Sequence, residues 1–202
     1  AQMLEQSSME RLHEDGRSCL RQITTSAAQM EKLIHELLEF ARCARSPLTL
    51  VPMDMEPVLA EALEAVAPDV TGRNIEWHRG SLPRVHGDAG LLRQVLVNLL
   101  SNAIKYTRTR PAARIEIGHR EGRAEEAVIF VRDNGVGFDS RRAGELFGVF
   151  KRLHSAKEFE GTGVGLAHAH RIIARHGGSM WAEAAVDRGA TFYFGLRRAS
   201  AN

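Results

Sequence analysis

Two amides and an ammonium recur on one face of the stretch 88–107. Asn98, Asn102 and Lys105 are spaced i, i+4 and i+7, which places them together on a helix. Amide oxygens suit Mg²⁺, and a lysine ammonium pairs with phosphate oxygens. The pattern therefore predicts a helix that binds a magnesium-bound nucleotide. A surface helix that happens to carry polar asparagines is the alternative interpretation.

The same stretch carries an apolar stripe on a second face. Its members recur at helical spacing and are Leu92, Leu96, Leu99 and Ala103. One face is thus expected to pack on a core, while the amide face stays open for chemistry.

A carboxylate follows the apolar run 128–131. Asp133 would be partly buried there and needs a hydrogen-bond donor. The exocyclic amine of adenine would supply one, and Gly135 and Gly137 would let the backbone approach a flat ring without a Cβ clash. An ordinary Asp-Asn-Gly turn is the alternative.

A glycine-rich segment, 161–165, precedes a predicted helix over 165–175. Free backbone N–H groups and the helix dipole at that point favour phosphate. The spacing is G-x-G-x-G and no strand leads directly into it, so a Rossmann site is excluded. The chain contains no Walker A lysine motif.

The elements that must position these groups are of two kinds. A long helix is predicted over 13–44, with a heptad seam that favours a bundle helix at a homodimer interface; a hairpin with 1–12 is the alternative. The rest predicts an α+β fold, with short strands, three helices and an irregular segment over 138–161. The seam residues are Leu20, Ile23, Ala27, Met30, Ile34, Leu37 and Ala41. The expected strands are 48–53, 74–79, 84–86, 114–120, 126–132, 179–184 and 190–196, and the helices 55–67, 88–107 and 165–175.

Composition narrows the function classes. A net charge of +2 over 202 residues gives no reason to expect nucleic acid or a membrane surface as partner. No apolar run approaches the ~18 residues of a membrane span. Cys19 and Cys43 have no metal-site spacing, which favours a reducing, cytoplasmic setting.

Taken in order, these three sites and the sequence FGVF at 147–150 resemble the N, G1, F and G2 boxes of sensor histidine kinases. The resemblance covers roughly residues 20–196, and the run over 150–178 looks most like phytochrome-type kinase modules. It implies a Bergerat-type α/β sandwich, with a mixed, mainly antiparallel sheet faced by three helices. It also implies the cofactors ATP and Mg²⁺ and a mobile lid over 139–162.

The resemblance also implies roles for single residues. Asn102 would ligate Mg²⁺, Asn98 and Lys105 would lie at the phosphates, Tyr106 would pack on the ribose or adenine side, and Asp133 would read adenine. His154 is a further lid candidate for phosphate, and Phe147 and Phe150 are expected mainly to pack the lid. The other positions assigned to the nucleotide are Gly135, Gly137, Lys151, Arg152, Gly161, Thr162, Gly163, Val164, Gly165, Leu166 and Thr191.

Asn98 bears on the type of reaction. Relatives of this fold that hydrolyse ATP, such as gyrase and MutL, have a glutamate base at this position, and an amide cannot take a proton at neutral pH. We therefore expect transfer of the γ-phosphoryl group to a nucleophile, with Asn98, Asn102 and Lys105 as catalytic residues.

The nucleophile expected from the resemblance is a histidine in a motif that none of the nine histidines matches. His35 is a partial match, in a helix that looks like the second of a bundle. We therefore expect residues 1–46 to be part of a dimerisation and phosphotransfer segment, and 47–202 to be the catalytic domain. A response-regulator receiver domain is the expected partner. A non-catalytic docking module and a gyrase-like ATPase remain alternatives.

Overall fold

Residues 14–43, 47–122, 125–155 and 158–200 are described by the computed structural model. The chain divides into two units, Ala1–Arg45 and Ser46–Asn202. The first unit contains helix α2 (Glu14–Cys43), close to the predicted 13–44. Residues 1–12, which the alternative hairpin would require, lie outside the described residues.

Helix α2 presents large apolar side chains to solvent. Ile23, Met30 and Ile34 of the predicted seam are each more than half exposed, and Leu38 beside them is half exposed. Glu14 and Asp15 lie in the first turn and Arg42 in the last, where each complements the helix dipole. The seam therefore has an apolar surface that this unit does not bury.

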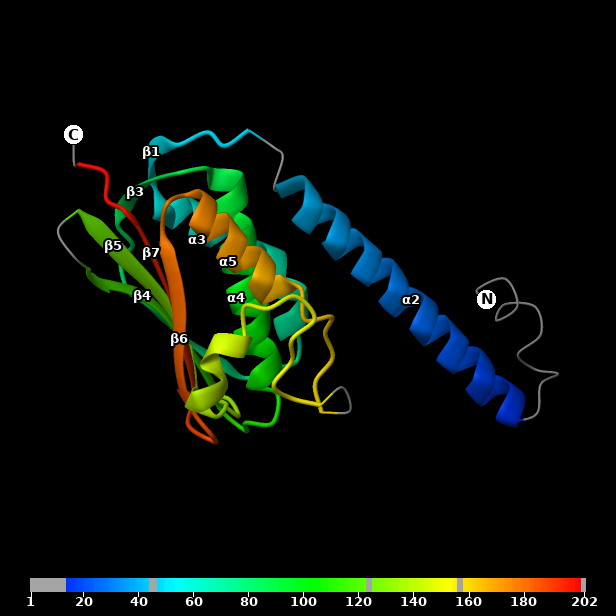
Figure 1. Ribbon diagram of the computed structural model, residues 1–202. Coiled ribbons are helices and arrows are strands. Elements are labelled where there is room, and N and C mark those ends of the chain that lie inside the picture. The colour runs from blue at the N-terminus through cyan, green and yellow to red at the C-terminus, as the bar shows by residue number, and fades with distance from the viewer. Residues whose placement is uncertain (1–13, 44–46, 123–124, 156–157, 201–202) are drawn as a thin grey trace. The chain divides into compact units, whose positions relative to one another are not determined.

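A five-stranded mixed sheet organises the second unit (Figure 1). Strands β4, β5, β7 and β6 pair antiparallel in that order, and β2 joins the β4 edge in parallel. The strands are β2 (Ile75–Arg79), β4 (Ala113–Glu121), β5 (Glu126–Asp133), β6 (Ser179–Ala185) and β7 (Gly189–Arg197).

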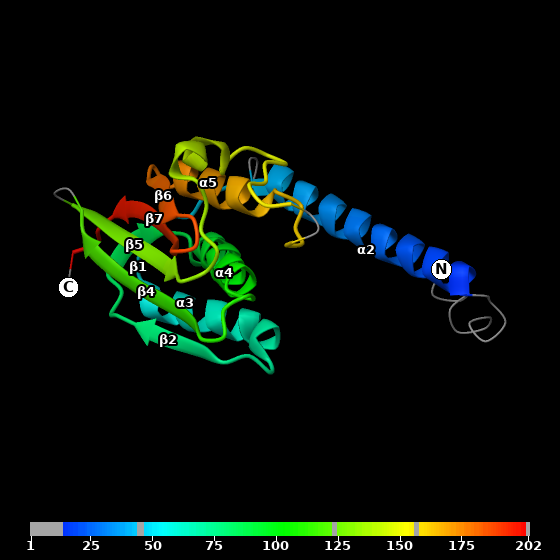
Figure 2. The same cartoon turned by 90° about the horizontal axis from the view of Figure 1, so that it is seen from below.

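Three helices cover one face of this sheet, as the turned view shows (Figure 2). They are α3 (Met55–Val66), α4 (Ala89–Tyr106) and α5 (Gly165–Arg175). A separate antiparallel pair is formed by β1 (Val51–Asp54) and β3 (Arg84–Gly87). The predicted fold, a mainly antiparallel mixed sheet faced by three helices, is confirmed.

Side chains set where these helices begin. The Asp54 carboxylate accepts a hydrogen bond from the Glu56 N–H at 2.9 Å, which caps α3. The Asp88 carboxylate accepts from the Leu91 N–H at 3.2 Å and caps α4. Helix α5 differs, because its N-cap residue, Val164, offers no side-chain hydrogen bond.

The core lies between the sheet and the helices. Leu92, Leu96 and Leu99 of α4 are fully buried, as the apolar stripe predicts. Strand β5 lies between β4 and β7; Ala127, Ile129 and Val131 are buried on one of its faces, and on the other the Phe130 ring lies 6.2 Å from that of Tyr193. In β7, Phe194 is buried on the helix side, whereas Tyr193 stacks on Trp181 on the other face.

Two local predictions differ from the structure. β1 lies at 51–54 instead of 48–53, and the segment predicted irregular contains a 3₁₀ helix, η3 (Ser140–Glu145); another, η2 (Ala67–Val70), follows α3. Strands β2 and β3 flank one connection but belong to different sheets. The reason is that the connection is anchored: the Leu82 N–H donates to the Glu56 carboxylate at 2.6 Å, and the Gly80 N–H donates to the Ile117 carbonyl at 2.9 Å.

Candidate functional site

The amide face of α4 meets the start of α5. Asn98 Nδ2 donates to the Gln94 carbonyl at 3.0 Å, which leaves its amide oxygen Oδ1 facing α5. A Cβ at Gly165 would stand only 2.5 Å from that oxygen. Glycine is therefore required at position 165 for the two helices to approach at this point.

Asn102 and Lys105 continue this face by two helical turns. The Asn102 side chain is half-buried and has no hydrogen-bond partner among the described residues. Lys105 Nζ lies 4.4 Å from the centroid of the Tyr106 ring, and a Cβ at Gly161 would be 3.3 Å from the same Nζ. The first and third constellations of the sequence are thus adjacent in space.

The turn into α5 leaves its first N–H groups without a capping side chain. Gly161 and Gly163 have φ values of 146° and 77°, which favour glycine. The Phe150 N–H donates to the Gly163 carbonyl at 3.0 Å, so the lid backbone rests on this turn. An uncapped helix N-terminus beside a lysine is a favourable place for an anion.

Asp133 ends β5 as a buried carboxylate, 6% exposed. Its Oδ1 accepts a hydrogen bond from the Gly135 N–H at 2.8 Å, and the Ala190 N–H also donates to the carboxylate. Burial raises the pKa of Asp133 to about 6, although both hydrogen bonds and the charge of Arg110 act in the opposite direction. The group is a strong acceptor held in an apolar setting.

Tyr106 joins the Asp133 turn to the lid. Its carbonyl accepts from the Val136 N–H at 3.2 Å, and its ring centroid lies 5.2 Å from that of His154 and 5.0 Å from that of Phe159. Burial raises the pKa of the Tyr106 phenol. The end of α4 is therefore covered by two lid side chains.

Two arginines fix the far end of the lid. The guanidinium of Arg152 donates to the carbonyls of Ser155 and Phe159. Arg108, just beyond α4, forms an ion pair with Glu160, and that pairing lowers the pKa of Glu160 to about 2. Of the lid cations expected at phosphate, Arg152 is engaged within the lid, while Lys151 is exposed.

Thr191 is not brought to this cluster. It pairs with Arg132 across the β5–β7 ladder, one residue out of phase with Asp133 and Ala190, so its side chain lies on the opposite face of the sheet. There it accepts a hydrogen bond from Arg132 Nε at 3.2 Å. A side-chain contact of Thr191 with a nucleotide at Asp133 is therefore incompatible with this register.

Gly135 and Gly137 are required by the protein itself. A Cβ at Gly135 would stand 2.5 Å from the Tyr106 carbonyl oxygen, and one at Gly137 would stand 2.0 Å from that of Ala185. We expected these glycines to make room for a flat ring. The structure gives a simpler reason for glycine, because backbone carbonyl oxygens lie where the Cβ of any other residue would be.

The residues fit Mg²⁺ only as a nucleotide-bound ion. The described part of the chain has no group of three or more His, Cys, Asp or Glu side chains that could hold a metal. A single amide oxygen, that of Asn102, is the ligand on offer. Mg²⁺ commonly takes one or two protein ligands and completes its octahedron with phosphate and water, so this donor set suits it.

Among the described residues, the histidines considered from the sequence lie apart from one another. His35 is exposed on α2, His168 and His176 are buried, and His170 stacks on Phe147 at 4.9 Å between ring centroids. These positions agree with structural or surface roles. His13 lies outside the described residues.

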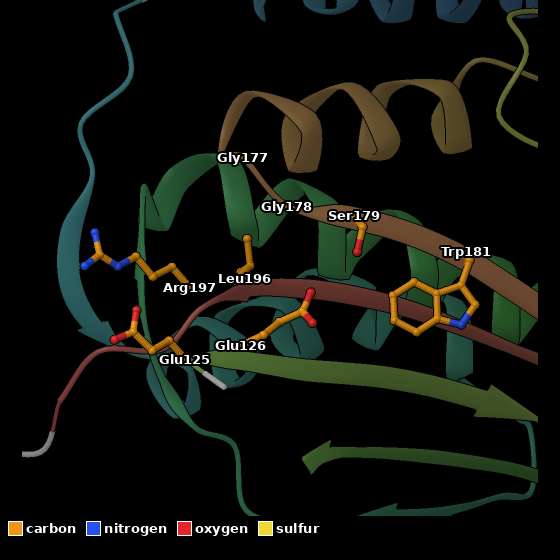
Figure 3. A pocket seen from close by; sticks show the side chains of 9 residues that line it. Glu125, Glu126, Gly177, Gly178, Ser179, Trp181, Leu196 and Arg197 are labelled. Atoms are coloured by element: carbon orange, nitrogen blue, oxygen red, sulfur yellow. The ribbon is translucent and has the colours of Figure 1, made fainter. Parts of the chain in front are cut away.

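A hollow of about 680 Å³ opens elsewhere, between the end of α5 and the ends of β5, β6 and β7 (Figure 3). The side chains of Trp181 and Glu126 line it (Figure 3). Gly195 also lines it, and a Cβ there would stand 2.1 Å from Glu126 Oε1. None of the residues assigned to the nucleotide from the sequence lines it. The convergent groups at Asp133, α4 and the start of α5 remain the candidate site.

Comparison with known families agrees with this site. A family model described as "Histidine kinase-, DNA gyrase B-, and HSP90-like ATPase" matches residues 87–200, more than half of the chain. The chain belongs to this ATPase family. The match spans α4, the Asp133 turn, the lid and α5, and so includes every group that converges here. The expected resemblance to histidine kinases is confirmed at this level.

The chain's curated relatives include histidine kinases. It is 34% identical to the phytochrome-like protein Cph1 of Synechocystis sp., over 96% of this chain and 26% of that protein. It is 34% identical to the adaptive-response sensory kinase SasA of Synechococcus sp., over 83% of this chain and 45% of the relative. The chain thus spans about a quarter of the phytochrome-like relatives and under half of SasA.

Solved structures support the same family. Full-length ShkA in complex with AMPPNP has a TM-score of 0.71 and 28% identity, covering 98% of this chain and 42% of that one. Histidine kinase ThkA in complex with the response regulator TrrA has a TM-score of 0.67 at 21% identity, covering 88% of this chain and 49% of that one, which shows the fold alone.

In the described part of this ATPase-family chain, no helix is long and apolar enough to cross a bilayer.

Sequence reasoning missed three contributors to the site. Phe159 and Glu160 lie in the lid, directly before the glycine-rich segment 161–165, and Arg110 lies in the loop after α4. Their partners are an aromatic ring, an arginine and backbone carbonyls from distant segments. Only the Phe-Glu-Gly spacing before the glycine segment could have indicated the first two, and no sequence signal marks Arg110.

Proposed function

We propose that residues 47–202 are the ATP-binding catalytic domain of a two-component sensor histidine kinase. The observation that supports this most is the convergence of the buried Asp133 carboxylate, the amide face of α4 and the uncapped start of α5 on one place. Each supplies one need of a nucleotide: an acceptor for a purine amine, an amide oxygen for a metal, and N–H groups for phosphate.

In this proposal, Asp133 accepts the adenine amine and Tyr106 packs on the ribose or adenine side. Lys105, close to Gly161, neutralises phosphate charge from beneath the lid, and Asn102 offers its oxygen to Mg²⁺. When bound, Mg²⁺ would supply charge neutralisation at the phosphate oxygens and hold them in line for transfer. Lid residues His154 and Phe159 would exclude water over Tyr106.

Asn98 favours phosphoryl transfer over hydrolysis. Its Nδ2 is bound to the Gln94 carbonyl, and its Oδ1 faces Gly165, so position 98 offers no proton acceptor toward water. A gyrase-like ATPase is the second candidate, since the family includes such enzymes. Steady-state phosphate release separates the two: this chain should release little phosphate, and Asn98→Glu should release more.

We further propose that the phosphoryl group passes to a histidine outside these 202 residues, and then to an aspartate of a response-regulator receiver domain. None of the chain's nine histidines lies in the expected acceptor motif. The chain alone should therefore not acquire acid-labile phosphate from labelled ATP. When an intact acceptor bundle is added, the bundle should acquire the label. Acid-labile label on the chain alone would contradict this.

Helix α2 would contribute a homodimer interface, because its exposed apolar seam needs a partner in water. Residues 1–46 would then be part of the dimerisation segment of a cytoplasmic kinase. Sedimentation would show a dimer that Ile34→Glu weakens. A non-catalytic docking module would also use such a helix, but it has no need of the nucleotide residues.

Nucleotide titration tests the proposal directly. Asp133→Ala and Asn102→Ala are compared with the unmodified chain, using ATP and ADP with and without Mg²⁺. We expect Asp133→Ala to weaken both nucleotides, and Asn102→Ala to remove the benefit of Mg²⁺. Arg114→Met, which removes an exposed pair with Glu76, is the control. Unchanged affinity in both site variants would refute the proposed function.

A further inference from the structure

Arg110 lies in the loop between α4 and β4 and reaches two distant turns. Its Nε donates to the Asn134 carbonyl at 3.0 Å, and its Nη2 donates to the Gly135 carbonyl at 2.9 Å. The same Nη2 donates to the carbonyl of Asp187 at 3.1 Å and to its carboxylate at 3.3 Å. One guanidinium therefore binds three backbone carbonyls and one carboxylate.

The contacts of Arg110 are specific to a guanidinium. The Arg110 side chain is 27% exposed, whereas that of Asp187 is 77% exposed. The hydrogen bonds to the Asn134 and Gly135 carbonyls are part-buried, and those to Asp187 are exposed. A planar guanidinium presents five N–H donors on three nitrogens and so reaches both turns here through Nε and Nη2, whereas a lysine ammonium presents its three donors from a single nitrogen. Arg110 therefore connects two turns through hydrogen bonds.

The loop that carries Arg110 is itself fixed. The Arg110 N–H donates to the Thr107 carbonyl at 2.9 Å. Thr107 is fully buried, and its hydroxyl donates to the Ala103 carbonyl at 2.7 Å. Arg73 also donates to that hydroxyl, at 3.2 Å. The guanidinium thus reaches the two turns from a rigid position at the end of α4.

The turn that Arg110 binds is the one that orients Asp133. The Gly135 N–H donates to Asp133 Oδ1 at 2.8 Å, and the carbonyl of the same glycine is held by Arg110. On the other side, the Asn134 side chain bonds the Arg114 N–H at 2.8 Å and the Ala112 carbonyl at 3.0 Å. The two peptides after Asp133 are therefore fixed on both sides.

We propose that Arg110 is a positioning residue for adenine recognition, which ties the Asp133 turn to the β6–β7 turn and so holds the Asp133 carboxylate in its binding orientation. The inference rests on the proposed function, because it assumes that Asp133 accepts the adenine amine. It goes beyond it by assigning a role to a residue that touches no nucleotide.

Arg110 also has an electrostatic effect on Asp133. The groups facing the carboxylate are the neutral phenol of Tyr106 from α4, the N–H groups of Gly135 and Ala190, and the charged Arg110. Arg110 lowers the pKa of Asp133, against the larger effect of burial. Without that charge, Asp133 would take up its proton at higher pH and lose its acceptor for the amine there.

The test measures ADP affinity of the whole chain from pH 5 to 8, below the melting temperature of each variant. In the unmodified chain, affinity falls as the pH drops through about 6, where Asp133 takes up its proton. Arg110→Met should weaken binding about tenfold at pH 7.5, as expected for one or two lost charge-assisted hydrogen bonds. It should also move the midpoint of the pH profile upward.

Arg110→Lys keeps the charge and loses the fork, so its affinity should fall several-fold with an unmoved midpoint. It also keeps the inference testable if Arg110→Met fails to fold. Arg114→Met, in an exposed arginine pair of the same region, should match the unmodified chain in both readouts. A purely structural role would lower the melting temperature alone.

Two results would overturn the inference, and they are distinguishable from failure of the proposed function. If Asp133→Ala abolishes binding while Arg110→Met or Arg110→Lys binds like Arg114→Met, Arg110 has no positioning role and the proposed function stands. If Asp133→Ala binds like the unmodified chain, adenine recognition by Asp133 is wrong, and the role of Arg110 is refuted with it.

Discussion

The amide oxygen of Asn98 faces the Cα of Gly165 so closely that a β-carbon there would stand 2.5 Å from it. Gly165→Ala should therefore displace the Asn98 amide or push α5 from α4, although alanine is the better helix former. We expect several-fold weaker binding of Mg²⁺–ADP by calorimetric titration. Gly144→Ala, whose added Cβ would meet nothing within 4 Å, should bind normally. Equal affinity in the two variants would mean that the Asn98–Gly165 contact is dispensable.

The buried carboxylate of Asp133 should cost stability at neutral pH. Its pKa is raised from 3.8 to about 6, so the stabilisation linked to its proton is complete below 3.8 and is lost as the pH rises through 6. Each pKa unit corresponds to about 1.4 kcal/mol, so Asp133→Asn should raise the free energy of unfolding at pH 7.5 by up to ~3 kcal/mol. It should also abolish adenine recognition.

Urea unfolding at pH 4.5 and 7.5 checks this, with Asp69→Asn in the exposed η2 segment as the control. The stabilisation by Asp133→Asn should shrink at the lower pH. A variant that is destabilised at pH 7.5 would show that the carboxylate, and not its neutral form, is favoured by the fold.

His176 links the ends of two helices and should make the fold acid-sensitive. Its Nδ1–H donates to the Ile172 carbonyl at 2.8 Å, and its Nε2 accepts from the Asp88 N–H at 3.0 Å. Burial lowers the pKa of His176, so its contribution is complete above the unfolded value of 6.5 and declines as the pH falls below that value. Protonation would turn the acceptor Nε2 into a donor that faces another donor.

His176→Leu should therefore lose about 1 kcal/mol at pH 7.5 and become less pH-dependent between 7.5 and 5 than the unmodified chain. Chemical unfolding at both pH values provides the measurement. His35→Gln, at an exposed position of α2, is the matched control. An unaltered pH dependence in His176→Leu would assign the acid sensitivity to another group.

The Arg108–Glu160 ion pair joins the lid to the end of α4 and should slow nucleotide release. Both side chains are about half exposed, 51% and 57%, so the pair should contribute under ~1 kcal/mol, a few-fold in rate, and less at high salt. Arg108→Glu should speed release of a fluorescent ADP in stopped flow, and the added Glu160→Arg should restore it. The Arg142–Glu145 pair, which lies within η3, gives the matched control swap. If the double variant releases ADP as fast as Arg108→Glu does, the ion pair does not slow nucleotide release.

Much of the fold follows from local signals. The stripe of Leu92, Leu96 and Leu99 predicted α4 to within a residue or two, and the predicted bounds of α5, 165–175, agree with the structure. These succeed because capping and helical periodicity are properties of neighbouring residues. The pairing of β3 with β1 was not predictable in that way, since it joins residues that are 30 to 36 positions apart, from Asp54 with Arg84 to Val51 with Gly87.

In the candidate site, too, local sequence predicts some residues, whereas others depend on contacts between distant segments. Asp133 was recognisable because an apolar strand ends in a carboxylate, and its burial follows from that position. The side-chain direction of Thr191 was not, because a register shift of one residue changes the face of the sheet. Arg110 carries no signal at all, because carbonyls of any sequence can be its partners.

The parallel pairing of β2 with β4 gives α4 a second importance. Parallel neighbours cannot be joined by a tight turn, so the chain must travel back along the sheet between them, and β3 and α4 form that path. An insertion or deletion in that helix would detach the sheet's edge as well as the catalytic groups. A related domain that has lost ATP binding should therefore differ by substitutions at positions such as 98 and 102, and should keep this helix at its full length.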